Sequence, residues 1–369
     1  MLRRAVVLLA IAACESGQAP PSSDVPLAFT TLCAPCHGPD ARGYVADRAP
    51  SLVNPTFLES ASDSFLQTSI ALGRPGTSMA GYGKEVGGPL APPQIAELVK
   101  WLRSRGPALV TLRAAGRGDV ARGAAIYARA CVTCHGTRDT RGSAVHLANP
   151  RFLQLASDAF VRWAIVNGRP GTAMEAWHGK LDDGQVDDLV AYVRSLSRPP
   201  PVALLPPPTG KEPLVLAPGG KAPSFALRDE VCPPRGASPA TNPCVPGPRY
   251  VSIDQVERAL AAGDRMIVID ARPASDWQRV HITGAVSIPY FDMARLAEVP
   301  RDGTWVIAYC ACPHHLSGIV IDELRKRGYA HTAVLDEGIL EWHRRGYPVV
   351  AAPGVGPPPA QAPPPATPH

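Results

Sequence analysis

The sequence predicts a multidomain protein in which two all-α units in tandem precede a small α/β unit with a parallel sheet. The first observation behind this prediction is an internal repeat that relates residues 33–104 to residues 131–195. The second is a proline-rich segment over residues 198–223, which separates the repeat from the rest of the chain. The third is the region over residues 250–350, where apolar runs typical of buried strands alternate with an amphipathic segment typical of a helix.

Each copy of the repeat opens with the pattern Cys-x-x-Cys-His, at residues 33–37 and again at 131–135. Two thiols at this spacing can each form a thioether with a haem vinyl group, and the adjacent histidine can bind the iron as proximal ligand. A single pentapeptide would also suit half of a zinc site or a redox-active cysteine pair, but two copies inside a longer repeat favour covalent haem. The predicted attachment residues are Cys33, Cys36, Cys131 and Cys134, and the predicted proximal ligands are His37 and His135.

Two further helices are predicted in each copy by signals at equivalent positions. Residues 62–73 and 157–168 each run from a Ser-Asp pair, which can cap a helix N-terminus, to a glycine that can end the helix. Apolar residues recur at helical spacing over 95–102 and over 186–193. An amphipathic helix is therefore expected to close each copy.

The sixth iron position can be assigned by elimination within the repeat. Met79 and Met174 occupy equivalent sites after a Gly-Arg-Pro-Gly-Thr turn, and the first copy contains no histidine other than His37. The second copy offers His146 and His178 as rivals, but neither has a counterpart in the first. Methionine in this position raises the reduction potential and leaves no open site, which suits electron transfer. The alternative is that both methionines fill the core.

Residues 24–197 resemble two class I cytochrome c domains in tandem, one over 24–107 and the other over 116–197. The resemblance implies a dihaem cytochrome with two covalently bound haem c groups and electron transfer as its activity. It also implies a helix before each attachment motif, which is expected to be shorter in the first copy. An aromatic residue near each haem on the closing helix would be Trp101 or Tyr192.

The N-terminus predicts export. Residues 1–14 begin with positive charge and continue as an apolar run that is too short for a comfortable membrane span. Small residues precede Cys14 and polar sequence follows it, as in a bacterial lipoprotein processing site. We expect a signal peptide, lipid on Cys14 and a location on the periplasmic side of a membrane. The alternative is an ordinary cleaved signal in which Cys14 has no role.

Composition limits the other function classes. The 369 residues allow three domains of modest size. The formal net charge is +5 and the basic residues form no block, so nucleic-acid binding has no support. Prolines cluster over 198–223 and over 351–369. The first cluster predicts a semi-rigid linker without a core, and the second a disordered tail.

The region over 250–350 predicts a reactive cysteine at the end of a strand. Residues 266–270 and 306–309 have the apolar character of short buried strands, and Cys310 follows the second directly. Because reactive residues of parallel sheets lie at the carboxyl ends of strands, Cys310 is a candidate nucleophile.

This region resembles a rhodanese-like domain. The motifs that carry the resemblance are Asp270-x-Arg272, residues 276–289, Tyr309-Cys310 and residues 338–349, which occur in the family's order. The resemblance implies that Cys310 becomes a persulfide inside a loop of backbone N–H groups at a helix N-terminus, which lowers its pKa. The predicted site residues are Cys310, Cys312, Asp270 and Arg272.

The loop after Cys310 departs from the family pattern. It contains Cys312, it has Pro313 where glycine is usual, it lacks the frequent arginine, and it is one residue longer. Cys312 could be a resolving thiol, or the nucleophile if the register shifts. His314 and His315 could supply positive charge near a thiolate. An inactive fold that is kept for packing or partner docking is the other interpretation.

Two cysteines, Cys232 and Cys244, lie in a proline-rich segment. In an exported protein this favours a disulfide between them. A zinc site that also takes Cys310 and Cys312 is the rival interpretation.

Two functions follow from the sequence. The first is a redox protein of inorganic sulfur chemistry, in which Cys310 holds sulfane sulfur from thiosulfate, sulfide or polysulfide. The enzyme would then be a thiosulfate or persulfide sulfurtransferase or a sulfur oxidoreductase, and its haems would exchange electrons with respiratory partner proteins. The second is a pure electron carrier whose rhodanese-like domain is an inactive interaction module.

Overall fold

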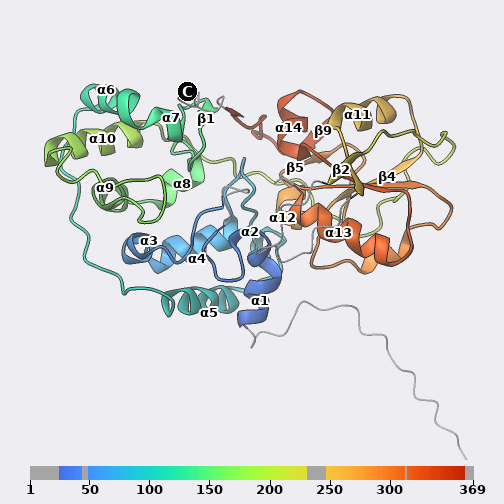
Figure 1. Ribbon diagram of the computed structural model, residues 1–369, viewed down its shortest axis with the longest axis horizontal. Helices are drawn as coiled ribbons and strands as arrows, with labels where there is room; N and C mark the ends of the chain where they lie inside the picture. Colours follow the sequence, from blue (N-terminus) through green and yellow to red (C-terminus); the bar gives the residue numbers. More distant parts are fainter. Residues whose placement is uncertain (1–24, 44–48, 231–246, 312–313, 362–369) are drawn as a thin grey trace, which may run out of the picture.

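The computed structural model describes residues 25–43, 49–230, 247–311 and 314–361. Figure 1 shows two helical repeats beside a third, α/β unit. Several sequence predictions lie outside the described residues, namely the signal peptide with Cys14, the Cys232–Cys244 pair, Cys312 and Pro313. Within the described ranges, no helix is both long and apolar enough to span a membrane.

The first repeat consists of helices and loops in the part that the structure describes. Its helices are α1 (Val25–Leu32), α2 (Ala34–His37), α3 (Pro55–Ser60), α4 (Asp63–Leu72), the 3₁₀ helix η1 (Lys84–Val86) and α5 (Pro92–Arg103).

The described part of the second repeat has the same order of α-helices, without a counterpart of η1. They are α6 (Val120–Ala130), α7 (Val132–His135), α8 (Pro150–Leu155), α9 (Asp158–Asn167) and α10 (Asp183–Ser195), with a two-residue strand β1 (Thr140–Arg141) after α7. In the described part of the chain, the helix before the attachment motif has 8 residues in the first repeat, where it starts at the first described residue, and 11 in the second.

The predicted helix ends are also confirmed. The hydroxyl oxygen of Ser62 accepts a hydrogen bond from the N–H of Phe65 at the start of α4, and Ser157 does the same at α9. Gly73 and Gly168 end these helices with φ of +63° and +61°, a conformation that strains other residues.

The two repeats face each other through equivalent residues. The side-chain amide of Asn54 donates to the carbonyl of Pro170, and that of Asn149 donates to the carbonyl of Pro75, each over 2.9 Å. Because the asparagines and the prolines are equivalent in the sequence repeat, the contact is reciprocal. The duplicated units therefore pack about an approximate two-fold axis.

Two guanidinium groups lie in the same interface. Arg74 lies over the ring of Phe152, and Arg169 lies over the ring of Phe57 in the opposite repeat, at 5.3 and 5.9 Å from the ring centroids. Burial lowers the pKa of both arginines to about 10. The contact between the repeats is thus desolvated as well as reciprocal.

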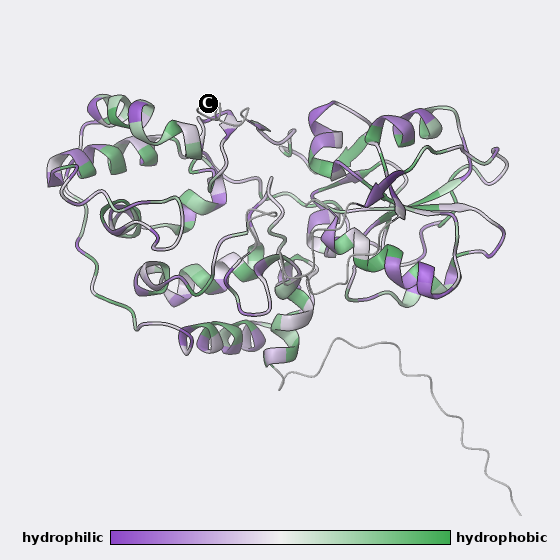
Figure 2. Ribbon diagram, in the orientation of Figure 1, coloured by the Kyte–Doolittle hydropathy of each residue, from purple (hydrophilic) through white to green (hydrophobic). Residues whose placement is uncertain are grey.

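The third unit contains most strands of the described chain. Its strands are β2 (Arg228–Glu230), β3 (Gly247–Val251), β4 (Met266–Asp270), β5 (Val280–Ile282), β6 (Val286–Ser287), β7 (Trp305–Tyr309), β8 (Thr332–Leu335) and β9 (Val349–Ala351). Its helices are α11 (Ile253–Ala261), α12 (Ala274–Trp277), the 3₁₀ helix η2 (Ala294–Glu298), α13 (His315–Lys326) and α14 (Gly338–Arg344). Figure 2 shows apolar and polar residues alternating along the helices around the sheet.

The prediction of a parallel sheet is wrong for one edge. The main sheet has the order β2-β3-β8-β7-β4-β6, and the pairs from β3 to β6 are parallel. At the edge, β2 pairs antiparallel with β3. The central strands are parallel because helices cross over between them, whereas β2 and β3 follow each other in the chain without a helix among the described residues. The sheet is therefore mixed.

The proline-rich segment packs more closely than its composition predicts. The side chain of Leu214 is 9% exposed and belongs to the core of the third unit, and the N–H of Leu216 donates to the carbonyl of Met266 over 2.8 Å. Beyond the third unit, β10 (Ala360–Gln361) pairs in parallel with β1 of the second repeat. Both proline-rich regions thus contact the folded units in their described parts.

The crossing of α6 and α10 depends on a glycine. A Cβ atom at Gly123 would collide with the carbonyl oxygen of Asp188 and with the side chain of Tyr192. We predict that Gly123→Ala lowers the free energy of unfolding of this helix pair by about 1–3 kcal/mol through overpacking. Hydrogen exchange of the α10 amides should then be faster. The control is Gly184→Ala in the first turn of α10, where an added Cβ meets only the Asp182 side chain. Equal exchange rates in the two variants would contradict the prediction.

Candidate functional site

The two attachment motifs hold their histidines in the same way. The Nδ1 atom of His37 lies 3.0 Å from the carbonyl oxygen of Pro50, and that of His135 lies 2.8 Å from the carbonyl oxygen of Val145. A ring that donates Nδ1–H to a carbonyl is fixed in the tautomer that presents Nε2 to a metal. Burial lowers the pKa of His135, which favours the neutral form that binds a metal. Both rings therefore suit a proximal iron ligand.

The four motif cysteines lie in or directly before the short helices α2 and α7. Burial raises the pKa of the Cys33 thiol to about 12 and that of the Cys131 thiol to about 11, so both side chains lie in apolar surroundings. Cys33 packs against an apolar cluster of the first repeat. Ala80 and Tyr82, which follow the first methionine loop, belong to this cluster. The structure therefore brings the attachment motif and the methionine loop of the first repeat to one apolar core.

The two methionine loops have the same backbone hydrogen bonds. In the first loop, the N–H of Arg74 donates to the carbonyl of Met79 over 2.7 Å, and the N–H of Met79 donates to the hydroxyl of Thr77 over 3.1 Å. The second loop repeats both bonds, at 2.7 and 3.1 Å, among Arg169, Thr172 and Met174. Both methionine side chains are partly exposed, which does not favour the interpretation that they fill the core.

The rival histidines of the second repeat are differently placed. His146 is 6% exposed, and its Nε2 atom lies 2.8 Å from the carbonyl oxygen of Thr137. His178 is exposed, with Nδ1 3.3 Å from the carbonyl oxygen of Val166. Neither contact occurs at an equivalent position of the first repeat, whereas the methionine loops are duplicated.

The aromatic residues of the closing helices contact the leading helices. Trp101 lies 4.6 Å from Phe29, and Tyr192 lies 4.9 Å from Tyr127, as measured between ring centroids. Each pair belongs to the apolar core beside the attachment motif of its repeat. These rings supply the apolar surroundings that a haem requires.

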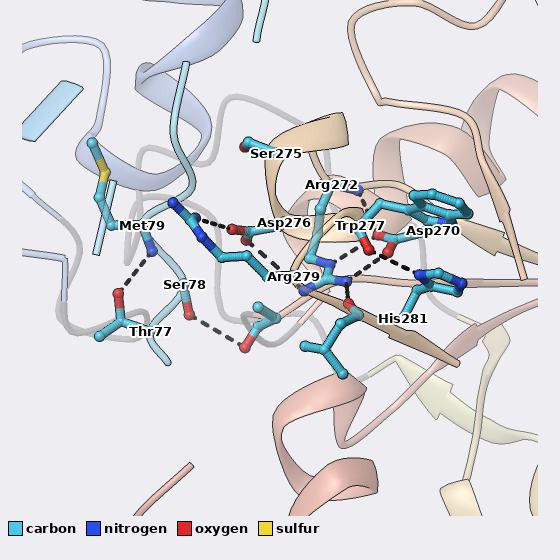
Figure 3. Close-up of polar contacts among 12 residues, drawn as sticks. Thr77, Ser78, Met79, Asp270, Arg272, Ser275, Asp276, Trp277, Arg279 and His281 are labelled. Carbon is cyan, nitrogen blue, oxygen red and sulfur yellow. Dashed lines mark hydrogen bonds and ion pairs between the residues drawn. The ribbon is translucent and has the colours of Figure 1, made fainter. Parts of the chain in front are cut away.

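Asp270 and Arg272 form a buried ion pair at the end of β4 (Figure 3). Arg272 donates from Nε to Oδ1 over 2.9 Å and from Nη2 to Oδ2 over 2.6 Å, and the hydroxyl of Tyr309 donates to the same carboxylate over 2.9 Å. Burial alone would lower the pKa of Arg272, but the charge of Asp270 raises it above its usual value. The pair ties the end of β4 to the residue before Cys310.

Cys310 lies at the carboxyl end of β7 and is 1% exposed. The hydroxyl of Ser317, in the first turn of α13, donates to its Sγ atom over 3.4 Å. The carbonyl of Cys310 accepts a hydrogen bond from the N–H of Ile339 over 3.0 Å. The predicted position after a buried strand and before a helix is therefore confirmed.

The loop histidines contact other groups. The Nε2 atom of His314 lies 2.6 Å from a carboxylate oxygen of Asp336, and its ring lies 4.1 Å from that of Tyr250. The Nδ1 atom of His315 lies 2.6 Å from the carbonyl oxygen of Pro35, inside the first attachment motif. The histidine contacts thus connect the loop with its own domain and with the first repeat.

A contact between the first repeat and the third unit is the feature that the sequence did not predict. Besides the His315–Pro35 contact, the hydroxyl of Ser78 donates to the carbonyl of Ala311 over 3.2 Å (Figure 3). Ser78 precedes the predicted ligand Met79, and Ala311 follows Cys310. These pairs are more than 230 residues apart in the chain, so neither spacing nor periodicity could have indicated them.

Two family models match the chain. Residues 118–193 match Cytochrome C oxidase, cbb3-type, subunit III, and residues 252–345 match the Rhodanese-like domain. The first match lies within the second repeat, and the second covers most of the third unit. The chain therefore contains a cytochrome c domain, which implies covalently bound haem c, followed by a rhodanese-like domain with a mixed sheet.

Two of the relatives are subunits of cbb3-type oxidases. A Cbb3-type cytochrome c oxidase subunit FixP of Bradyrhizobium sp. (strain ORS 278) is 33% identical over 179 residues, which cover 46% of this chain and 58% of that protein. A subunit CcoP of Azospirillum sp. (strain B510) is 30% identical over 188 residues, 46% of this chain and 60% of that protein. This chain thus spans less than two thirds of the length of these relatives.

One solved structure, of the Kuenenia stuttgartiensis reducing HAO-like protein complex Kustc0457/Kustc0458, is similar with a TM-score of 0.34 and 20% identity. The match covers 48% of this chain and 99% of that chain.

The buried histidine of the rhodanese-like domain makes a pH-dependent contribution to stability. His281 stacks on Trp277 with ring centroids 3.9 Å apart, and burial lowers its pKa. Because the unfolded histidine, with a pKa of about 6.5, binds a proton more readily than the folded one, the free energy of unfolding should fall as the pH drops through that value. We predict that His281→Gln weakens this pH dependence in urea unfolding, and that substitution of the exposed His331 does not. An unchanged dependence in His281→Gln would contradict the prediction.

Proposed function

We propose that the chain is an exported c-type cytochrome with two haems that exchanges electrons with respiratory proteins. The observation that carries this proposal is the duplicated geometry of the two repeats. Each repeat presents a histidine whose Nδ1 faces a backbone carbonyl and a methionine on an identically hydrogen-bonded loop. A histidine and a methionine as axial ligands suit electron transfer, because they leave no position for a substrate.

The proposed roles of the residues follow the repeat. Cys33 and Cys36 attach the first haem, and Cys131 and Cys134 attach the second. The axial ligands are His37 with Met79 in the first repeat and His135 with Met174 in the second. The matched cytochrome c domain supports the second haem directly, and the equivalence of the loops supports the first.

Export and lipid attachment at Cys14 complete this proposal. They are supported by the positively charged start, the short apolar run and the small residues before Cys14. Covalent attachment of haem outside the cytoplasm agrees with this location. The membrane contact would then be made by lipid, and the redox partners would be proteins of a respiratory chain.

The rhodanese-like domain binds or transfers sulfane sulfur at Cys310 in this proposal. Support comes from the position of Cys310 at a strand end, from the Ser317 hydroxyl at its Sγ atom, and from the N-terminus of α13 that follows. Asp270 and Arg272 act as positioning residues, since they hold the strand ends beneath the loop. Cys312 serves as a resolving thiol.

Two observations favour a second function. Cys310 is 1% exposed, and the loop that follows it contacts the first repeat. In this alternative, the rhodanese-like domain is an inactive module that orients the first repeat, and the chain is an electron carrier alone.

Axial ligation can be tested with the methionines. The oxidised spectrum of a haem with a methionine ligand has a weak sulfur-to-iron band at its red end. We predict that Met79→Ala and Met174→Ala each lower the absorbance of this band by about half, because each removes the ligand of one of two haems. The double variant should lose the band entirely. Met293→Ala, outside both repeats, is the control and should leave the band intact. If the band persists in the double variant, the axial assignment is wrong.

Sulfane sulfur binding can be tested without any electron acceptor. Thiosulfate should leave one extra sulfur atom on Cys310, detected by mass spectrometry of the peptide, and cyanide should remove it as thiocyanate. We predict no such product from Cys310→Ser, whereas Cys312→Ser should alter only the rate. Loss of the product in Cys312→Ser alone would mean that Cys312 is the nucleophile. A wild-type chain that never carries the extra sulfur would favour the inactive module.

A further inference from the structure

The loop that follows Cys310 lies directly on the residues that would hold the first haem. Pro35, whose carbonyl contacts His315 over 2.6 Å, stands between the two attachment cysteines of the first repeat. Ser78, which donates to the carbonyl of Ala311 over 3.2 Å, adjoins the predicted ligand Met79. Both sides of the first haem site, the attachment motif and the methionine loop, therefore meet the loop of Cys310.

Apolar packing joins the same two regions. Cys36 packs against the core cluster of the rhodanese-like domain that contains Cys310 and Leu316, and helices α2 and α13 are in contact. The side chain of Cys36 is one of the two predicted haem attachment points. Packed side chains therefore fill the space between the thiol of Cys310 and the proposed site of the first haem.

Buried polar groups fix this arrangement. The hydroxyl of Tyr290 donates to the carbonyl of Leu32 over 2.7 Å and lies 3.2 Å from the hydroxyl of Tyr82, and both rings are buried. The hydroxyl of Ser275, which is 0% exposed, donates to the carbonyl of Gly81 over 2.6 Å. Because a buried polar group without a partner is costly, these bonds select one orientation of the two domains.

Arg279 extends the contact from the ion pairs of the rhodanese-like domain. Its Nη1 atom lies 3.0 Å from a carboxylate oxygen of Asp276 (Figure 3). Its Nη2 atom donates to the carbonyl of Leu72 over 2.7 Å. Leu72 is the last residue of α4, directly before the first methionine loop. The loop that carries Met79 is therefore held from both of its sides by the rhodanese-like domain.

The first repeat also contacts the second through the reciprocal asparagine–proline bonds. It therefore contacts both the rhodanese-like domain and the second repeat. One chain holds two sites for one-electron carriers and one thiol that can undergo two-electron chemistry.

We propose that Cys310 and the two repeats form a single sulfide-oxidising unit, an inference that rests on the proposed haem sites and on the proposed sulfur chemistry of Cys310. The thiolate of Cys310 and a hydrosulfide ion form an S–S bond and give a persulfide, with release of one proton to solvent and two electrons. In balanced form, Cys310–S⁻ and HS⁻ yield Cys310–S–S⁻, H⁺ and two electrons. The oxidant would be ferric haem held by Cys33, Cys36, His37 and Met79 in the first repeat and by Cys131, Cys134, His135 and Met174 in the second, and each haem would accept one of the two electrons.

The residues around Cys310 assist this step. The hydroxyl of Ser317 donates to Sγ and stabilises negative charge on the thiolate and on the persulfide. The N-terminus of α13, a helix of 12 residues, favours the same charge. The product persulfide is the species that sulfurtransferase chemistry would pass on.

The experiment uses the full-length, fully oxidised holoprotein without oxygen. Sodium sulfide is added, haem reduction is followed by stopped-flow absorbance, and the sulfur content of the Cys310 peptide is measured by mass spectrometry. We expect one persulfide for every two electrons received by the haems. The Cys310→Ser variant should carry no added sulfur. Sulfide should reduce the haems of this variant at least about tenfold more slowly than those of the wild type.

The contact itself is tested with the double variant Ser275→Ala and Tyr290→Phe, which removes buried hydrogen bonds without touching Cys310 or an axial ligand. Its haem reduction by sulfide should slow by roughly tenfold, because loss of these buried hydrogen bonds lowers the population of the docked arrangement of the two domains. Persulfide formation from thiosulfate needs no electron acceptor and should not change. Tyr329→Phe is the matched control, because it loses a similar bond, to the carbonyl of Val299 over 2.7 Å, away from the interface.

The outcomes separate this inference from the proposed function. If thiosulfate modifies Cys310 but sulfide reduces the haems of Cys310→Ser as fast as those of wild type, the inference is overturned and sulfane sulfur binding stands. If neither compound leaves sulfur on Cys310, the proposed sulfur chemistry fails as well. Equal slowing in the double variant and in Tyr329→Phe would overturn the role of the contact.

Discussion

The hydrogen-bonded pair of Tyr82 and Tyr290 is the interaction on which the arrangement of the domains depends most. Both hydroxyls are buried between the first repeat and the rhodanese-like domain, and burial raises the pKa of both phenols well above its usual range. Neutral phenols in such a place need partners, and the carbonyl of Leu32 supplies the remaining one. Since Leu32 lies directly before the first attachment motif, the bond fixes that motif against the rhodanese-like domain.

A second constraint comes from the duplication. Phe65 and Phe160 occupy equivalent positions and stack on each other with ring centroids 5.1 Å apart. Arg74 and Arg169, at the starts of the methionine loops, lie over the rings of Phe65 and Phe160, and each loop accepts a hydrogen bond from an asparagine of the other repeat. The geometry that presents one methionine is therefore maintained partly by the opposite repeat.

The sequence predicted those parts of the fold that are determined locally. The caps Ser62 and Ser157 and the terminal glycines Gly73 and Gly168 depend on residues within one turn, so their pattern was sufficient. The strand before Cys310 was likewise indicated by its own apolar residues.

The sequence did not predict contacts between residues that are far apart in the chain, and three examples show the physical reason. The proline-rich segment was expected to separate the domains, but Leu214 and Leu216 pack into the rhodanese-like domain. The antiparallel edge strand β2 is polar, Arg228–Glu230, and has no apolar run that predicts a strand. The contact of Ser78 with Ala311 depends on two short polar groups whose sequence context gives no sign of it.

The central claim is that Ala311, directly after Cys310, lies against the proposed site of the first haem. Methyl NMR of the holoprotein tests it most directly, because an oxidised haem broadens and shifts the signals of nearby protons. The account predicts a large difference between oxidised and reduced spectra for the methyl group of Ala311, and a small one for Ala259 in α11, on the part of the domain that packs against its own sheet. If the Ala311 methyl is as insensitive to haem oxidation as that of Ala259, the rhodanese-like domain does not hold its cysteine at the first haem, and the account is wrong.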